Sequence, residues 1–296
     1  MGDEHSFAVV DVFTDRALSG NPVAVFPRAD DLPPHTMQAI AREFGFSETT
    51  FVMAPRHPRA VRRLRCFSPA AEVFGAGHNA LGAWWLLAVS GHSVVPTDGV
   101  VAQELGDQVL PVVVTLKEGH VHRVTMQQLM PTIEPQSRRR HSLASALGLS
   151  PDEMHPALEP AVSSTGATRH LLAPVVDEGA LARIRVDSRA LVAVAREVGC
   201  EGCYAFCIGA NSDSAAAHAR GFFPGIGITE DAATGSAAGP LGLYLVQREL
   251  APIGQTLIIE QGAHLHRRSR IEVFVDETSV HVGGSCVVVM RGQLRL

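Results

Sequence analysis

Two short segments of the chain combine residue types that bind small anions. Gly77 and His78 stand directly before one apolar stretch, and Gly235 and Ser236 open another. The first turn of a helix presents unpaired N–H groups and about half a positive charge, and glycine there lets a ligand approach the backbone. Each segment therefore predicts a helix start that binds a carboxylate, with close helix–sheet packing as the alternative role of the glycines.

Acid–base chemistry needs a proton carrier as well as an anion site. Glu48, in FGFSETTFVM, follows a glycine that ends a helix and precedes an apolar strand. Partial burial there is expected to raise the pKa of the carboxyl group toward neutrality, so that it takes a proton and returns it elsewhere, as an isomerase requires. The alternative is an ordinary exposed turn at this position.

Two further side chains lie beside the predicted helix starts. His78 is either a solvent-facing residue of the first helical turn or a donor to a substrate oxygen. Asp231, in the loop before Gly235, is either a charge partner of the helix or a contact for a substrate hydroxyl or amino group. A carboxylate beside an anion site favours a ligand that carries both an acid and a hydrogen-bond donor.

The composition indicates a globular protein. Of the 296 residues, 46% are hydrophobic and 19% are charged, with a net charge of −5. This length allows about two domains, and the negative balance disfavours nucleic acid as a partner. No apolar stretch reaches the roughly 18 residues of a membrane-spanning helix, and the N-terminus does not resemble a secretory signal. We therefore expect a cytoplasmic protein without a membrane partner.

The other reactive residues do not indicate a metal or a cofactor. Cys203 and Cys207 share a face of one predicted strand but lie about 13 Å apart along it, too far to bind one ion. Lys117 is the single lysine, at a strand end, which disfavours pyridoxal phosphate. GAGHNA at 75–80 matches the dinucleotide-binding fingerprint but lacks its βαβ context, so a dinucleotide-dependent oxidoreductase is kept only as an alternative.

The spacing of apolar residues and helix breakers predicts an α+β fold of hairpins and short helices. Helices are expected to end at Gly45 and to span 78–89 and 188–198, with short strands between them. Residues 128–143, rich in Pro, Ser, Gln and Arg, predict a linker, and Arg138–Arg140 within it predict a solvated edge.

The two glycine-rich segments belong to longer stretches that resemble each other. In each stretch a strand ends in Phe-x-Pro, at Phe67–Pro69 and at Phe222–Pro224, and a short loop leads to the glycine that opens an apolar helix. We infer an internal duplication of about 150 residues, one domain length. A duplication of this kind is expected to place two equivalent helix starts across a cleft from each other.

These segments together resemble the phenazine-biosynthesis isomerase (PhzF-like) family, which shares the diaminopimelate epimerase fold. The resemblance covers essentially the whole length. It is carried by DVFTDRALSGNPVAVF at 11–26, IAREFGFSETTFV at 40–52, RCFSPAAEVFGAGH at 65–78, GIGITEDAATGSAAGPLGLYL at 225–245 and HVGGSCVVVMRGQLRL at 281–296.

The resemblance implies two pseudo-symmetric lobes, each a curled and mostly antiparallel sheet around a central helix, with the active site in the cleft between them. We assign the N-terminal lobe to 1–130, with strands in 284–296 expected to return to it, and the C-terminal lobe to 131–283. The family also implies a cofactor-free homodimer. Its best-known member isomerises trans-2,3-dihydro-3-hydroxyanthranilate by moving a hydrogen from C3 to C1.

Carried over by motif, the proton-shuttling glutamate of the family falls on Glu48. The first cleft motif falls on Gly77 and His78, and the second on Asp231, Gly235 and Ser236. In the implied mechanism Glu48 moves the proton, while His78, Asp231 and Ser236 position the substrate. The backbone at Gly77 and Gly235 is expected to bind its carboxylate.

The chain departs from the family pattern at the edge expected to face the substrate. Asn79-Ala80 stands where Pro-Thr or Ala-Thr is common, and Ala232 where Pro is common. We count Asn79 among the substrate-binding residues for this reason. Related epimerases place a catalytic cysteine at each helix start, whereas here those positions hold Ala76 and Thr234, which argues against a two-thiol racemase.

The leading hypothesis is a cofactor-independent isomerase of a small unsaturated hydroxy or amino carboxylic acid, acting in specialised-metabolite or antibiotic biosynthesis. A family member that binds a small carboxylate without catalysis, or with another specificity, is the main alternative. The dinucleotide-dependent oxidoreductase is the third.

Overall fold

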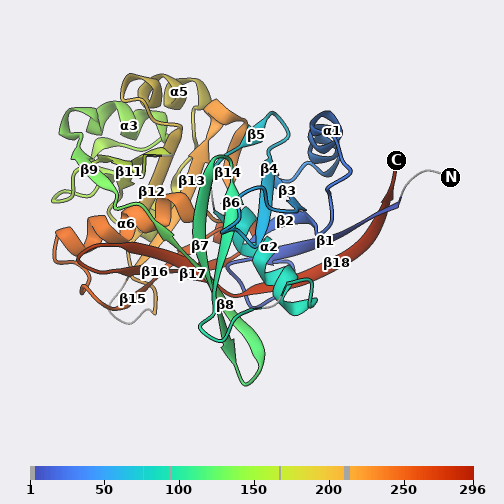
Figure 1. Ribbon diagram of the computed structural model, residues 1–296. Helices are drawn as coiled ribbons and strands as arrows, with labels where there is room; N and C mark the ends of the chain where they lie inside the picture. The colour runs from blue at the N-terminus through green and yellow to red at the C-terminus, as the bar shows by residue number, and fades with distance from the viewer. Residues whose placement is uncertain (1–3, 76, 94, 167, 210–213) are drawn as a thin grey trace. The chain divides into compact units, whose positions relative to one another are not determined.

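The computed structural model describes residues 4–75, 77–93, 95–166, 168–209 and 214–296. The chain forms two compact units, Met1–Gln127 with Gly283–Leu296 (unit 1) and Gln128–Val282 (unit 2). Each unit combines a sheet with a few helices, which confirms the predicted α+β class (Figure 1). Among the described residues, no helix combines the length and the apolar character needed to cross a membrane.

Unit 1 has strands in the spatial order β18-β1-β2-β3-β4-β6-β7-β8, in which β2–β3 and β4–β6 are parallel pairs and the others antiparallel. Its elements are β1 (Glu4–Val12), β2 (Asn21–Phe26), α1 (Pro34–Phe44), β3 (Glu48–Met53), β4 (Arg62–Phe67), β5 (Glu72–Val73), α2 (His78–Val89), β6 (Val100–Leu105), β7 (Gln108–Lys117), β8 (His120–Gln128) and β18 (Cys286–Arg295).

Unit 2 repeats this order as β9-β10-β11-β12-β13-β15-β16, again with its third and fifth pairs parallel. Its elements are β9 (Thr132–Pro135), α3 (Arg140–Ala146), β10 (Ala161–Ser164), β11 (Arg169–Pro174), α4 (Glu178–Arg183), α5 (Ser188–Glu197), β12 (Gly202–Ile208), β13 (Ala217–Phe223), β14 (Ile228–Asp231), α6 (Gly235–Gln247), β15 (Thr256–Gln261), β16 (Ser269–Val275) and β17 (Val280–Gly284), with 3-10 turns at Ser137–Arg139, Pro151–Glu153, Pro224–Ile226 and Ala263–Leu265. The shared order of pairings supports the inferred duplication.

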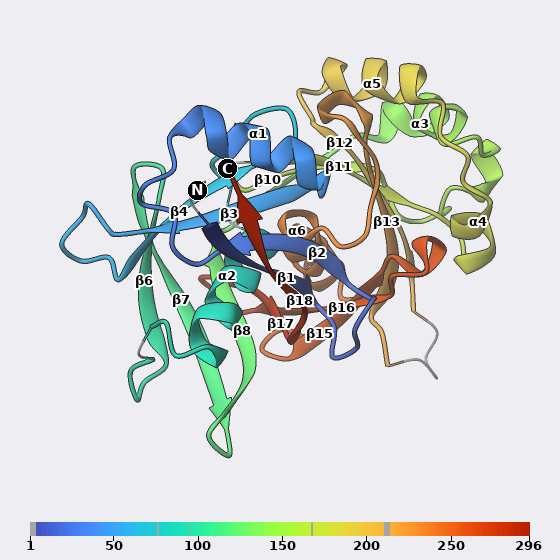
Figure 2. The ribbon, with the colours of Figure 1, turned by 90° about the vertical axis from the view of Figure 1, so that its right-hand side faces the viewer.

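One face of the unit 1 sheet packs against α1. The helix contacts β3 and β4 (Figure 2), and its Met37 and Ile40 join a cluster of phenylalanines from the strands. The rings of Phe26 and Phe51 stack with centroids 5.1 Å apart. Aromatic side chains of this size bury a large apolar area, so this cluster anchors the strand β3 that carries Glu48.

The other face of the same sheet encloses α2, which contacts β1, β2, β3, β7 and β18. Trp84 of this helix is fully buried and donates its ring N–H to Gln103 Oε1 at 2.8 Å. Gly82 faces β1 and β2, where a side-chain carbon would lie 2.5 Å from Val23 Cγ1 and 3.0 Å from Val12 Cγ2. The helix therefore lies closer to these strands than a larger residue would permit.

Unit 2 has the same layering. Helices α3, α4 and α5 cover one face of β11, β12 and β13 with an apolar cluster, and Figures 1 and 2 both show α3 and α5 side by side there. Helix α6 contacts β9, β10, β15 and β16 and is buried along almost its whole length. Phe206 of β12 contacts Tyr244 of α6 edge to face, with ring centroids 5.5 Å apart.

The helix over 78–89 is confirmed at both ends, and Gly45 ends α1 in the left-handed conformation as expected. The predicted linker at 128–143 is wrong, because this segment contains β9 and the start of α3. Arg140 is not part of a solvated edge, since its guanidinium donates to the carbonyls of Met154 and His155. The polar composition of this segment gave no strand signal, because β9 is stabilised by its pairing with β10 and not by its own apolar residues.

We predict that Gly82→Val lowers the free energy of unfolding by about 2 kcal/mol or more, because overpacking outweighs any gain in helix propensity. Urea unfolding monitored by circular dichroism measures the loss. Gly225→Ala is the control, since its added methyl would be 3.5 Å from Glu201 O, an ordinary contact. Equal stability of both variants would contradict the close packing of α2.

Candidate functional site

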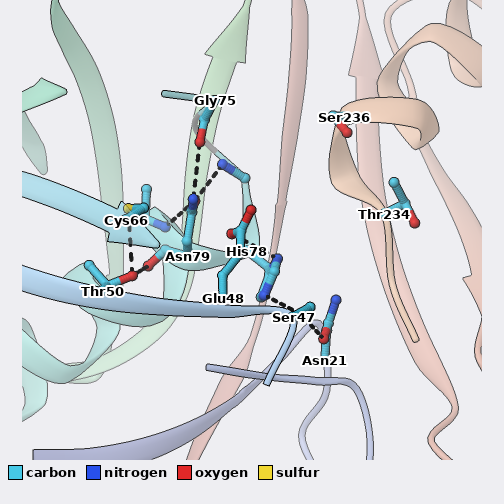
Figure 3. A network of polar contacts seen from close by, with 12 residues as sticks. Asn21, Ser47, Glu48, Thr50, Cys66, Gly75, His78, Asn79, Thr234 and Ser236 are labelled. Carbon is cyan, nitrogen blue, oxygen red and sulfur yellow. Dashed lines mark hydrogen bonds and ion pairs between the residues drawn. The ribbon is translucent and has the colours of Figure 1, made fainter. Parts of the chain in front are cut away.

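Unit 1 brings Glu48 and His78 together. Glu48 is the first residue of β3, and alternation along the strand points it to the same side as Thr50, whose hydroxyl bonds Asn79 O of α2 at 3.2 Å. His78 is the first residue of α2, and its Nδ1 lies 3.6 Å from Glu48 Oε2 (Figure 3). A carboxylate with 22% of its side chain exposed thus faces a buried imidazole.

A serine and an asparagine hold the far side of the imidazole. Ser47 Oγ lies 3.4 Å from His78 Nε2 and 3.4 Å from Asn21 Oδ1 (Figure 3). Burial lowers the pKa of His78 to about 4, so the ring is neutral at neutral pH and carries a single proton. A neutral imidazole between a hydroxyl and a carboxylate is suited to donating a hydrogen bond rather than to neutralising charge.

Asn79 shapes the start of α2. Its Oδ1 accepts from the backbone N–H groups of Gly77 and Ala80, both at 2.7 Å, and its amide donates to Gly75 O at 3.0 Å. The residue is completely buried. The assignment of Asn79 as a substrate-binding side chain is therefore corrected to a structural role, because all of these groups are already engaged within the loop. The Gly77 N–H is likewise used by Asn79 and not held open for a ligand.

Unit 2 positions Asp231 through the loop that precedes α6. Thr234 Oγ donates to Asp231 Oδ2 at 2.7 Å, and Gln261 Nε2 donates to the carbonyl of Asp231 at 2.8 Å. Gln261 Oε1 accepts from Tyr204 OH and from the N–H of Thr234. Burial, followed by the charge of Asp231, raises the pKa of Tyr204 well above its usual value. The carboxylate of Asp231 is thus buried, and hydrogen bonds within the loop fix its position.

The helix start in unit 2 presents Gly235 and Ser236. Residues in the first turn of a helix have no intrahelical acceptor for their N–H groups, so both N–H groups are of the kind that binds an anion. The carbonyl of Gly235 accepts from Gln128 Nε2 at 2.9 Å. Ser236 Oγ lies 3.1 Å from Nε2 of His170, a residue of β11.

The carboxylate of Glu230, next to Asp231, has a structural role. It forms two 2.8 Å hydrogen bonds with Arg220, whose guanidinium also donates to the carbonyl of Leu181. Unit 1 repeats the pair as Arg65 and Glu72, again with the guanidinium over a phenylalanine ring. The two adjacent acids, Glu230 and Asp231, therefore differ in role. Glu230 forms a buried ion pair with Arg220, whereas Asp231 remains a candidate site residue.

The duplication does not extend to Glu48. The pairing of β3 with β4 and of β12 with β13 aligns Thr49 with Cys203, so Gly202 corresponds to Glu48. A side-chain carbon at Gly202 would lie 2.2 Å from Phe222 O. No carboxylate fits there, so Glu48 has no counterpart in unit 2.

The described residues contain no group of three or more His, Cys, Asp or Glu side chains arranged to bind a metal ion. Cys203 and Cys207 are buried in β12, and burial raises the pKa of both thiols. At the second helix start, Thr234 bonds Asp231, while Ala76 lies outside the described residues.

Sequence reasoning did not identify Asn21, Gln261 or His170. Each is separated by many residues from the group that it contacts, so no local motif contains both partners. Ser47 is part of the SETT motif, but the sequence carries no sign that it contacts His78, which lies 31 residues away in the chain.

We predict that Glu230→Gln lowers the free energy of unfolding by about 2–4 kcal/mol, because it leaves the buried charge of Arg220 without its partner. Chemical denaturation measures the difference. Glu4→Gln is the matched control, since it removes one partner of the exposed pair with Arg295, and we expect it to cost less than about 1 kcal/mol. Similar losses for both variants would show that the buried pair is not structural.

We also predict a pH dependence of stability from the two buried histidines. Burial lowers the pKa of both His78 and His170 to about 4, below the ordinary value of about 6.5. Between these values the unfolded chain binds more protons, so stability falls as the pH drops through this window, by about 2 kcal/mol per ring at pH 5.

Urea unfolding at pH 7 and pH 5 tests this pH dependence. The double variant His78→Gln/His170→Gln should lose less stability between the two pH values than the parent does, whereas exposed His120→Gln should behave as the parent. An unchanged loss in the double variant would contradict the prediction.

Comparisons with known proteins point to one family. The family model described as phenazine biosynthesis-like protein (PhzC-PhzF) matches residues 10–292. A Pseudomonas aeruginosa protein named trans-2,3-dihydro-3-hydroxyanthranilate isomerase is 35% identical over 274 residues, covering 90% of this chain and 89% of that protein. An uncharacterised isomerase of Clostridium acetobutylicum is 30% identical and covers 97% of each chain.

Solved structures agree with this likeness. A phenazine biosynthesis protein of the PhzF family from Bacillus anthracis has a TM-score of 0.90 and 25% identity, covering 99% of this chain and 100% of that chain. A predicted epimerase from Pseudomonas aeruginosa has a TM-score of 0.83 and 32% identity, covering 98% and 99%. A hydroxyproline epimerase from Agrobacterium vitis, 13% identical with a TM-score of 0.64 over 99% and 93%, shares the fold.

The predicted epimerase-like fold and the resemblance inferred from the motifs are both confirmed by these matches. Because the family model covers nearly the whole length and a curated relative reaches 35% identity, this chain belongs to the phenazine biosynthesis-like (PhzC-PhzF) family.

Proposed function

We propose that this protein is a cofactor-independent isomerase that moves a proton, and with it a double bond, within a small unsaturated carboxylic acid. The observation that carries the proposal is the Glu48 carboxylate at the start of β3, 3.6 Å from the buried imidazole of His78. The names of the curated relatives as isomerases support the same class of reaction.

The proposed reaction is a proton transfer with no net oxidation. The Glu48 carboxylate removes a proton from a substrate carbon, and the electron pair of the broken C–H bond shifts into a new double bond. The original double bond opens at its far end, where the carboxylic acid of Glu48 returns the proton. Because Glu48 returns the proton that it removed, the reaction needs no oxidant or reductant.

His78 has the geometry to assist this step. Its ring is neutral, contacts Glu48 through the Nδ1 edge and Ser47 through the Nε2 edge, and is held at the first turn of α2. We assign its single ring proton to the side of Glu48, so that the imidazole orients the carboxylate. A neutral donor avoids a fixed positive charge that would pair with Glu48 and weaken it as a base.

In unit 2, we assign the carboxylate of the substrate to Ser236 and the N–H groups that open α6. Asp231, held by Thr234 at the end of β14, is assigned to a hydroxyl or amino group of the substrate. A small molecule with both a carboxylate and a hydrogen-bond donor matches the helix start at Ser236 and the carboxylate of Asp231. That both helix starts act on one substrate stays a prediction.

The name of a curated relative supports the proposed substrate class. Trans-2,3-dihydro-3-hydroxyanthranilate, named for the Pseudomonas aeruginosa relative, is a suitable first candidate because it is an unsaturated acid with amino and hydroxyl groups. A role in specialised-metabolite or antibiotic biosynthesis, a homodimeric assembly and a cytoplasmic location belong to the same proposal. The changed residue at Ala232 is compatible with a different acid of this class.

We predict that Glu48→Gln keeps the fold but slows turnover by about 10²–10⁴-fold, the usual contribution of a general acid–base group. The measurement is proton NMR of trans-2,3-dihydro-3-hydroxyanthranilate in deuterated buffer, following both product and deuterium incorporation. Glu43→Gln, on the exposed side of α1, is the control and should leave the rate unchanged.

Near-normal turnover of Glu48→Gln would exclude Glu48 as the base. If the unaltered protein binds the acid but exchanges no proton with any candidate, the non-catalytic binding alternative replaces this proposal. Tight and specific binding of a nicotinamide or flavin in a titration would favour the oxidoreductase alternative instead.

A further inference from the structure

His170 is a buried histidine that none of the roles above uses. It lies in β11, is only 3% exposed, and its Nε2 is 3.1 Å from Ser236 Oγ. The ring contacts Phe223 edge to face, with centroids 5.2 Å apart, and its backbone carbonyl accepts from Ser163 Oγ. Strand pairing and aromatic packing therefore hold the imidazole against the hydroxyl that we assign to the substrate carboxylate.

The two ring nitrogens of His170 are in different surroundings. Within the part of the chain that the structure describes, Nδ1 is buried and has no hydrogen-bond partner. Burial lowers the pKa of His170 to about 4, so the ring is neutral at neutral pH and carries one proton. A proton on Nδ1 would bury an N–H group without an acceptor, which costs about 1–3 kcal/mol.

The proton is therefore favoured on Nε2, where it meets an acceptor. Nε2–H then donates to Ser236 Oγ at the observed 3.1 Å. Because the serine oxygen accepts from the ring, the proton of the serine hydroxyl cannot point at the ring. It points elsewhere and is available to an acceptor on a ligand.

We propose that His170 is a positioning residue that makes Ser236 a hydrogen-bond donor, so that the hydroxyl selects a ligand carboxylate. This inference rests on the assignment of Ser236 to the substrate carboxylate in the proposed function. The opposite tautomer, with the proton on Nδ1, would make Ser236 donate to the ring and offer a lone pair to the ligand. Such a site would favour an amino or hydroxyl group instead.

The tautomer itself can be read without any ligand. In protein labelled with ¹⁵N-histidine, long-range ¹H–¹⁵N correlation spectra at pH 7 distinguish protonation at Nε2 from protonation at Nδ1, and the signals lost in His170→Gln identify the ring. Protonation at Nε2 is expected. Protonation at Nδ1 would overturn the inference.

Binding of anthranilate, measured by titration calorimetry, tests the consequence. Ser236→Ala should weaken binding about 10- to 100-fold, the range for a lost hydrogen bond to a charged group, and His170→Leu about 5- to 10-fold. His170→Gln, whose amide N–H reaches a similar position, should restore affinity to within about 3-fold of the parent. The neutral analogue 2-aminobenzamide should lose less affinity in every variant, because its bond to Ser236 is not charge-assisted.

Two comparisons separate a positioning role from a loss of folding. In the double variant His170→Leu/Ser236→Ala, affinity should equal that of Ser236→Ala alone, because His170 acts only through the hydroxyl. His120→Leu, an exposed histidine on β8, should bind as the parent does. A further loss in the double variant, or no rescue by His170→Gln, would overturn the inference.

The outcomes also distinguish this inference from the proposed function. If Ser236→Ala leaves anthranilate binding unchanged, the carboxylate assignment of Ser236 fails, and the role of His170 fails with it. If Ser236→Ala weakens binding while His170→Leu does not, only the role of His170 fails.

Discussion

The burial of α2 and α6 is the constraint on which the rest of the structure depends. Both helices are apolar on almost every side, so each must be enclosed by the sheet of its own unit. A helix buried along its length leaves few positions where polar chemistry is possible. The first turn is the natural one, because its N–H groups have no intrahelical acceptor. Glycine and small polar residues at these two helix starts are the result.

The duplicated units share their scaffold and differ in their chemistry. The order of strand pairings, the central helix and the arginine–glutamate pair over a phenylalanine ring occur in both. These features stabilise the strand and loop that lead into each helix. The polar contacts at the two helix starts differ: Glu48 lies beside His78 in unit 1, and Ser236 contacts His170 in unit 2. The tight backbone contact at Gly202 excludes a second glutamate.

Both sites use buried neutral histidines next to a serine. Burial lowers the pKa of His78 and of His170 to about 4, and each ring nitrogen Nε2 lies within 3.4 Å of a serine hydroxyl. Neutral rings in a poorly hydrated setting act through the direction of their single proton rather than through charge. Hydrogen-bond direction at Ser47 and Ser236 therefore depends on what the Nδ1 atom of each ring meets. In unit 1 it meets Glu48, and in unit 2 it meets no hydrogen-bond partner among the described residues.

The sequence by itself determined the α+β class, the duplication, both central helices and the family, because these depend on apolar spacing, on Phe-x-Pro and glycine signals, and on motifs contained in short segments. It did not reveal that Glu230 pairs with Arg220, or that the Asn79 side chain is engaged in hydrogen bonds within its own loop. It also mistook the β9 segment for a linker. Only the tertiary structure decided these points and the pairing of His170 with Ser236, 66 residues away, since a polar group acquires its role from the partner that folding places beside it.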